Sequence, residues 1–363
     1  MKITAHRFVA AGALFGLAAL LSAAFRTHAE DIKVVRTMVS ISNARFGNYW
    51  PTPTAKEPVY NTWSWLPRAS FYLKGTMPPG AQVSIAYMLP DGKPWLTVPL
   101  VANKVGESDY YACGHDYSSQ EAGKPAKTIV GTFPFKITLK DPLAGSNTVL
   151  YTGKYTVGKF HKGNALPAFK NQFEYYVDQD WRLPIAFVAP DYSDSYRDNP
   201  ALQVKLYLKG EVDQERLEGV LMYDGKVIAS KELRGSGTYS KFMLTTTGMD
   251  KGDPLWRLWN FSFGGVRLTV PEYNRMDTYW YLSEHPGEYE LKVLRDGTLA
   301  RSVKFTVAEG GKFVDNGMGE QANDEANAIV PAKIVGATDG KWDAKAWKEE
   351  AFYGNPLTGF EAP

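Results

Sequence analysis

Residues 286–307 read PGEYELKVLRDGTLARSVKFTV and contain two runs in which apolar and polar residues alternate. Asp296-Gly297 separates the first run, Tyr289–Val293, from the second, Ser302–Phe305. Alternation with a period of two is typical of a strand with one buried face. Asp-Gly tolerates the positive φ of a tight turn. The stretch therefore predicts an antiparallel β-hairpin.

The same pattern occurs elsewhere in the chain. Val83–Tyr87 and Val204–Leu208 alternate in the same way, and Asp91-Gly92 and Asp224-Gly225 supply further turn signals. Many short strands without long helical periodicity favour β-sandwiches over α/β layers. We expect an all-β fold of antiparallel sandwiches.

Five blocks recur in the same order in two parts of the chain. In the first part they are FYLKG (71–75), MLPDGK (88–93), GTFPFKI (131–137), KYTV (154–157) and GKF (158–160). In the second part they are LYLKG (206–210), MYDGK (222–226), GEYELKV (287–293), KFTV (304–307) and GKF (311–313). A repeated order of this kind predicts two tandem copies of one domain.

The repeat divides the chain into four parts. We expect a signal peptide at 1–29, a first sandwich at 30–162, a second at 163–315 and a C-terminal tail at 316–363. Within the tail, residues 343–352 could form a short amphipathic helix. The tail either packs back on its own domain or docks on a partner.

The hairpin of residues 286–297 resembles the late hairpin of immunoglobulin-like and fibronectin-like bacterial modules. In those modules a tyrosine at the start of the strand hydrogen-bonds back to the corner, and here Tyr289 takes that position. Phe133 stands at the matching position of the first copy, so the corner hydroxyl is missing there. The usual cysteine pair is missing from both copies, since Cys113 is the only cysteine. The resemblance implies a sandwich and names no ligand.

The start of the chain indicates export. Basic residues come first, and residues 8–25 are then apolar or small, which is the order of a secretory signal peptide. We expect cleavage after Ala29, with residues 22–24 offering an earlier site, and a periplasmic or extracellular protein. A retained anchor stays open as an alternative, because residues 8–25 are just long enough to span a hydrocarbon core of roughly 30 Å.

The charge balance argues against two classes of partner. Removing residues 1–29 lowers the number of basic residues from 41 to 38 against 39 acidic residues, a net charge of −1. A nearly neutral chain without a dense Lys/Arg run has no footprint for nucleic acid or anionic lipid. No later stretch has the length and apolarity of a membrane span. We therefore expect no nucleic-acid partner and no membrane span after cleavage.

No catalytic set stands out. Cys113, His115 and Asp116 bring a thiol, an imidazole and a carboxylate together, but the members of a triad usually converge from separate elements. No Gly-x-Ser-x-Gly elbow surrounds a serine. As a lone cysteine, Cys113 is expected to be a small buried residue. We expect a protein that is not an enzyme and needs no cofactor, with a hydrolase or metal-dependent enzyme as the remaining alternative.

Metal-ligand patterns are sparse. The few histidines and the single cysteine form no cluster with zinc or copper spacing. Asp191, Asp194 and Asp198 share one polar loop and make a weak candidate for a calcium site. Their spacing does not match the Asp-x-Asp-x-Asp-Gly calcium loop, and Asp-rich loops are commonly solvated turns.

Aromatic residues are abundant, at 13% of the chain and including ten tryptophans. Trp and Tyr suit binding surfaces because each combines an apolar body with a polar group. The candidate surface consists of Trp50, Trp63 and Trp65 around a Pro-rich stretch, with Trp342 and Trp347 in the tail. About half of the tryptophans are expected in the cores instead.

These observations predict an exported, non-catalytic interaction or structural protein of the cell envelope or extracellular space. It would bind a protein partner through sandwich edges, loops and tail, which are ready docking elements. The alternative is a carbohydrate-binding protein whose exposed Trp and Tyr side chains stack on polysaccharide.

Overall fold

The strands of the chain are built from the alternating runs and end at the predicted turns. At Asp296-Gly297 the φ angles are 48° and 78°, the pair of positive values that a two-residue type I′ turn requires. At the turn before Lys93, only Gly92 has a positive φ, and its amide donates to Leu89 O. That turn is a three-residue connection, the next most common hairpin type. Asp224-Gly225 also has two positive φ angles, 47° and 72°, between the antiparallel strands that it joins. All three predicted hairpins are confirmed.

The computed structural model describes residues 31–46, 64–115, 125–161, 173–193, 199–209, 216–234, 238–239, 256–273, 275–315, 317–335 and 352–353. The predicted signal peptide at 1–29 and residues 343–351 of the predicted tail helix lie outside these ranges. Within the described ranges the fold is all-β with two β-rich domains, as predicted.

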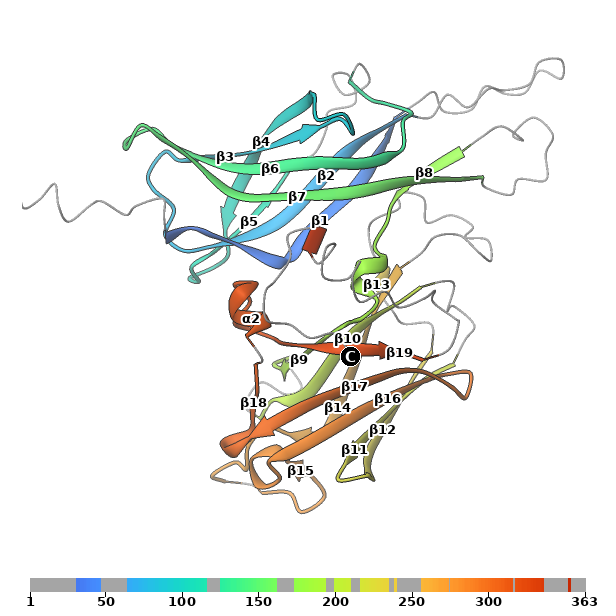
Figure 1. The fold of residues 1–363 in the computed structure, drawn as a ribbon. Helices are drawn as coiled ribbons and strands as arrows, with labels where there is room; N and C mark the ends of the chain where they lie inside the picture. The colour runs from blue at the N-terminus through green and yellow to red at the C-terminus, as the bar shows by residue number, and fades with distance from the viewer. Residues whose placement is uncertain are drawn as a thin grey trace, which may run out of the picture.

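The N-terminal domain, β1–β8, forms an eight-stranded sheet with the order β1-β2-β5-β4-β3-β6-β7-β8 (Figure 1). Its strands are β1 (Lys33–Phe46), β2 (Ser64–Lys74), β3 (Gln82–Met88), β4 (Pro94–Lys104), β5 (Tyr110–Gly114), β6 (Gly131–Asp141), β7 (Ser146–His161) and β8 (Phe173–Val177). All of these pairings are antiparallel.

The C-terminal domain, β9–β19, forms a sheet with the order β12-β11-β16-β17-β19-β9-β10-β14-β13, to which β15 and β18 are attached at the side. Its strands are β9 (Ile185–Asp191), β10 (Ala201–Lys209), β11 (Arg216–Tyr223), β12 (Lys226–Arg234), β13 (Thr238–Tyr239), β14 (Trp256–Arg267), β15 (Trp280–Tyr281), β16 (Gly287–Arg295), β17 (Thr298–Ala308), β18 (Lys312–Phe313) and β19 (Ala328–Ile334). Only β14 and β15 pair in parallel in the described part.

Helical structure in the described ranges is short. The named elements are the 3-10 helices η3 (Asp180–Arg182), η5 (Leu282–Glu284) and η6 (Glu309–Gly311) and the α-helix α2 (Met318–Gln321), and residues 352–353 are also helical. None of the helices in these ranges has the length and apolarity to cross a membrane.

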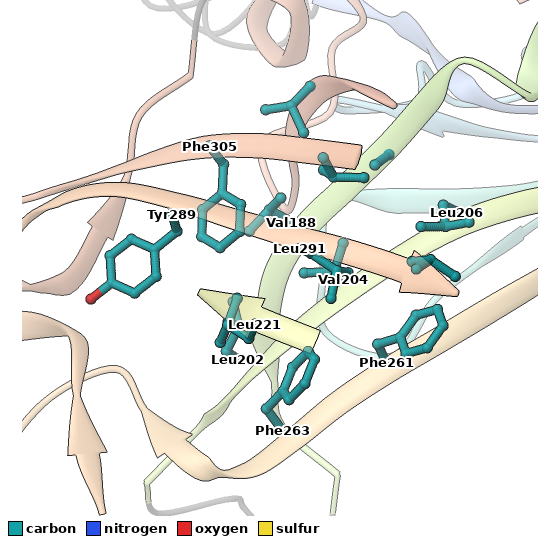
Figure 2. Packing of buried hydrophobic residues seen from close by; sticks show 14 of the residues in the cluster. Val188, Leu202, Val204, Leu206, Leu221, Phe261, Phe263, Tyr289, Leu291 and Phe305 are labelled. Carbon is teal, nitrogen blue, oxygen red and sulfur yellow. The ribbon is translucent and has the colours of Figure 1, made fainter. Parts of the chain in front are cut away.

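Each sheet folds over on itself, so that two layers enclose a core, which is consistent with a β-sandwich. In the C-terminal domain, side chains from β9, β10 and β14 point toward side chains from β11, β16 and β17 (Figure 2). The residues labelled there are Val188, Leu202, Val204, Leu206, Phe261 and Phe263 from the first layer and Leu221, Tyr289, Leu291 and Phe305 from the second. Burial of this apolar surface is the main stabilising contribution to the domain.

Two strands pair across the domain boundaries that the sequence repeat predicted. β8 follows residue 162, where the second sandwich was predicted to begin, yet it pairs with β7 of the N-terminal domain. β19 falls in the predicted tail, yet it lies between β17 and β9 and joins the two layers of the C-terminal domain.

β10 differs from the half-buried strand that its alternation predicts. Leu202, Val204 and Leu206 point into the core, but Gln203 and Tyr207 on the opposite face are also buried. The reason is tertiary, because this outer face of β10 is turned toward the N-terminal domain.

Candidate functional site

The two domains are joined by polar contacts that are themselves buried. η3 directs Arg182 into the boundary, where Nη1 donates to Tyr207 Oη at 2.7 Å and Nη2 donates to Val39 O at 2.8 Å. Burial opposes the charge of Arg182, but the hydroxyls of Tyr207 and Tyr353 raise its pKa above the ordinary value. The charged side chain therefore connects β10 to β1 of the other domain.

A second set of contacts joins β1 to the segment that follows β18. Asn323 Nδ2 donates to Val34 O at 2.9 Å, and Thr37 Oγ1 donates to Asp324 Oδ2 at 2.6 Å. Lys74 forms an ion pair with Glu325. Buried polar groups are stable only when they are hydrogen-bonded, so the buried Thr37–Asp324 contact favours one defined arrangement of the two domains, whereas Glu325 of the ion pair is exposed.

Next to these contacts lies a groove of about 1070 Å³ that both domains line. The N-terminal domain contributes residues near the start of β1 and the end of β2, and the C-terminal domain contributes β9, β10 and the segment from η6 to β19. Its lining includes Asp31, Lys33, Met38, Lys74 and Asp109 on one side and Tyr192, Gln203, Lys205, Lys312 and Phe313 on the other. We call it the interdomain groove.

Gln203 is the most informative residue of the interdomain groove. Its side chain is 7% exposed, and within the described part of the chain its amide has no hydrogen-bond partner. The neighbouring strands place Ala189 on one side of it and Ser262 on the other. Neither amide atom of Gln203 is among the fully enclosed side-chain atoms without a partner, so the amide is open to the groove. A ligand offering both a donor and an acceptor would satisfy it.

Several lysines that line the groove form no salt bridge with a described residue. Among the described residues, Lys33, Lys205 and Lys312 have no salt bridge, whereas Lys74 is paired. Several acidic residues of the lining are already used: Asp315 accepts from the backbone amides of α2, and Asp324 and Glu325 hold β1 and β2. The groove therefore offers the ammonium groups of Lys33 and Lys312 near the amide of Gln203, while Lys205 also acts on Asp191. The carboxylates of Asp31, Asp109 and Glu320 line the same groove.

The predicted aromatic surface is corrected at Trp65. Its side chain is 1% exposed and lies in the core of the N-terminal domain. The indole Nε1 donates to Ile129 O at 3.0 Å, and the ring meets Trp95 and Phe133 edge-on. Trp65, Leu66 and Pro67 are all buried, so this end of β2 has no exposed face on which an indole could lie. Trp50, Trp63, Trp342 and Trp347 lie outside the described residues.

Of the three aspartates in the weak calcium candidate, only Asp191 lies within the described residues. Asp191 Oδ2 accepts from Ser262 Oγ at 2.5 Å, and Oδ1 accepts from the amide of Ser193. Burial raises the pKa of Asp191, but these hydrogen bonds outweigh it and lower the pKa below the ordinary value. Asp194 and Asp198 lie outside the described residues. The described ranges hold no group of three or more potential metal ligands from His, Cys, Asp and Glu.

The predicted burial of Cys113 is confirmed. The residue lies in the core of the N-terminal domain, and burial raises the pKa of its thiol to about 12. A thiol with a raised pKa is a poor nucleophile at neutral pH. The neighbouring His115 lies close to Pro67 O through Nε2, at 3.3 Å. Asp116 lies outside the described residues.

Sequence reasoning missed Arg182, Gln203 and the contacts of residues 352–353. The alternation in Leu202–Leu206 indicates that Gln203 points away from its own core, but it does not indicate that another domain covers it. No protein-family model matches the chain, and a search of curated proteins finds no match.

Proposed function

We propose that the chain is an exported, non-catalytic interaction protein that binds a protein partner in the interdomain groove. The observation that carries this proposal is a groove lined by both domains, in which the side-chain amide of the largely covered Gln203 has no hydrogen-bond partner among the described residues. A peptide segment supplies the donor and the acceptor that the amide needs, and an acidic side chain on that segment would pair with Lys33 or Lys205.

We further propose that both domains are immunoglobulin-like. In the constant-type arrangement, strands A, B and E are neighbours in one sheet and C, F and G in the other. Lettering β1, β2, β3, β5, β6 and β7 as A, B, C, E, F and G gives A-B-E and C-F-G neighbours. The same letters for β9, β10, β11, β14, β16 and β17 give the same neighbours. Tyr289 Oη donates to His285 O at 2.7 Å, as a tyrosine corner does.

Matching positions also support a duplication of one domain. Gly131 and Gly287 both have a strongly positive φ, and each pairs with a valine of the next strand. Two residues further on, Phe133 stacks on Tyr155 at 5.5 Å, and Tyr289 stacks on Phe305 at 5.4 Å. The stacked pair is kept while phenylalanine and tyrosine exchange strands.

Carbohydrate binding is the alternative, and Tyr192 is the observation in its favour. The ring lines the groove and is 63% exposed, so it could stack on a sugar. The six tryptophans in the described ranges are all buried or half-buried: Trp65, Trp95, Trp181, Trp256, Trp259 and Trp280. These indoles therefore add no exposed platform, which favours a protein partner.

The test is capture from the native envelope with the full mature chain as bait, followed by mass spectrometry. Lys205→Glu should lose the captured protein, and Gln203→Ala should weaken its retention at least fivefold. Lys136→Glu, the same charge change on an exposed position of β6, is the matched control and should retain it. Equal capture by all variants would refute the groove as the binding surface. Binding of the chain to a polysaccharide array, lost in Tyr192→Ala, would establish the alternative instead.

A further inference from the structure

Phe352 and Tyr353 fill a closed site between the two domains. Both side chains are almost completely buried, although the strands nearest to them belong to different domains. Figure 1 draws residues 352–353 as a short red piece beside β1. Phe352 also packs in one apolar cluster with Ile329 of β19, the strand that precedes it in the chain.

Phe352 occupies the side of the site that belongs to the C-terminal domain. Its ring packs in a small apolar cluster and meets Trp181 edge-on at 5.5 Å between ring centroids. The other members of the cluster are Ile185, Met318, Ala322 and Ile329. The carbonyl of Phe352 accepts a hydrogen bond from Tyr151 Oη of the N-terminal domain. One residue therefore contacts both domains.

Tyr353 occupies the side that belongs to the N-terminal domain. Its ring lies 6.2 Å from Phe135 and 5.1 Å from Trp181, and the guanidinium of Arg182 lies 5.8 Å from the ring centroid. Its hydroxyl accepts from the amide of Ile41 at 2.8 Å and donates to Gln179 Oε1 at 3.3 Å. Every polar and apolar part of the side chain is thus contacted.

The backbone of the N-terminal domain leaves room for this segment. A Cβ on Gly153 of β7 would lie 2.9 Å from the carbonyl oxygen of Tyr353 and 2.7 Å from the ring of Phe135. Phe352 and Tyr353 both have positive φ angles, 45° and 62°. L-residues adopt such angles only where their surroundings determine them. The site therefore imposes a conformation on its occupant, as a receptor does on a peptide.

We propose that the boundary between the domains is a recognition site for an aromatic dipeptide, which the chain fills with its own Phe352-Tyr353 to fix the domain arrangement. Tyr353 contacts Trp181, Arg182 and Gln179 in and beside η3, and the same Arg182 donates to Val39 O of β1. Occupation of the site thereby orders the contacts that border the interdomain groove. The inference does not depend on what the groove binds.

The experiment compares three full-length mature chains: wild type, Tyr353→Phe and the double variant Phe352→Ala/Tyr353→Ala. The main readout is hydrogen exchange at the amide of Ile41, whose acceptor is the Tyr353 hydroxyl. Tyr353→Phe keeps the ring and should speed that exchange roughly two- to tenfold, the value of one hydrogen bond. The double variant should speed it more than a hundredfold, while amides in the cores of β3 and β16 keep their protection.

A peptide with the sequence of residues 348–357, added in trans, then tests recognition directly. It should bind the double variant and restore slow exchange at Ile41, and the same peptide with alanine at both aromatic positions should not. Unchanged exchange in the double variant, or failure of the peptide to bind a double variant whose domain cores remain protected, would overturn the proposal. Protection at Ile41 that depends on chain concentration in the wild type would assign the dipeptide to a second copy and would also overturn it.

Discussion

The hydroxyl of Tyr353 accepts a hydrogen bond from the backbone amide of Ile41 at 2.8 Å, across 312 positions of the chain. The same hydroxyl donates to Gln179 Oε1, and Gln179 directly precedes the 3-10 helix that carries Arg182. One phenolic group therefore connects β1, η3 and the C-terminal region. The contacts between the domains are consequently expected to form and break together.

Arg182→Met should lower the free energy of unfolding by about 2–4 kcal/mol. The substitution keeps much of the side-chain volume but removes the donors to Val39 O and Tyr207 Oη, and hydrogen bonds to charged groups contribute about 1.5–3 kcal/mol each. Urea unfolding measures the change. Arg275→Met is the control, because Arg275 is exposed and pairs with Glu284 at the surface, where such pairs contribute less than about 1 kcal/mol. Equal losses in the two variants would contradict the structural role of Arg182.

Gly153→Ala should lower the free energy of unfolding by about 1–3 kcal/mol, the usual effect of an overpacked site. The added methyl group would overlap the ring of Phe135 and the carbonyl of Tyr353. Gly265→Ala is the matched control in another strand, because a Cβ there meets nothing within 4 Å, and it should be neutral or slightly stabilising. Thermal unfolding of both variants distinguishes these outcomes, and a neutral Gly153→Ala would show that the contact is not close-packed in solution.

Tyr289→Phe should destabilise the C-terminal domain by about 1–3 kcal/mol. The hydroxyl donates to His285 O and accepts from Trp280 Nε1 at 3.1 Å, so its removal leaves both groups without this partner. Tyr223→Phe removes a more exposed bond to Pro286 O and should cost less than about 1 kcal/mol. Chemical unfolding monitored on both variants gives the ranking, and the reverse order would argue against a tyrosine corner at this position.

Alkylation of Cys113 by iodoacetamide at pH 8 should be roughly a thousandfold slower in the native protein than in urea. The reason is that burial raises the pKa of the thiol from 9.0 to about 12, which lowers the thiolate fraction by about that factor. Because the pKa is raised on folding, the contribution to stability is complete below pH 9 and is lost as the pH rises toward 12. Comparison of wild type and Cys113→Ala between pH 8 and pH 11 isolates this dependence. A native thiol that reacts as fast as the unfolded one would contradict its burial.

The sequence by itself determined the strands, their turns and the inward faces. In β16 the predicted alternation places Tyr289, Leu291 and Val293 in the core, and Asp296-Gly297 makes the turn. These features are local, because a period of two and a residue tolerant of positive φ act over a few positions. The burial of Cys113 followed in the same way from the properties of a single residue type.

Only the tertiary structure decided how the outer faces are used. Gln203 and Tyr207 read as the exposed side of β10, yet the other domain covers them, and Trp65 reads as a surface aromatic but lies in a core. β19 joins two layers although its sequence falls in the predicted tail. The interdomain groove and the site of Phe352-Tyr353 depend on residues more than a hundred positions apart. Local patterns cannot specify such contacts, because each partner gains its stabilisation only after both domains have folded and met.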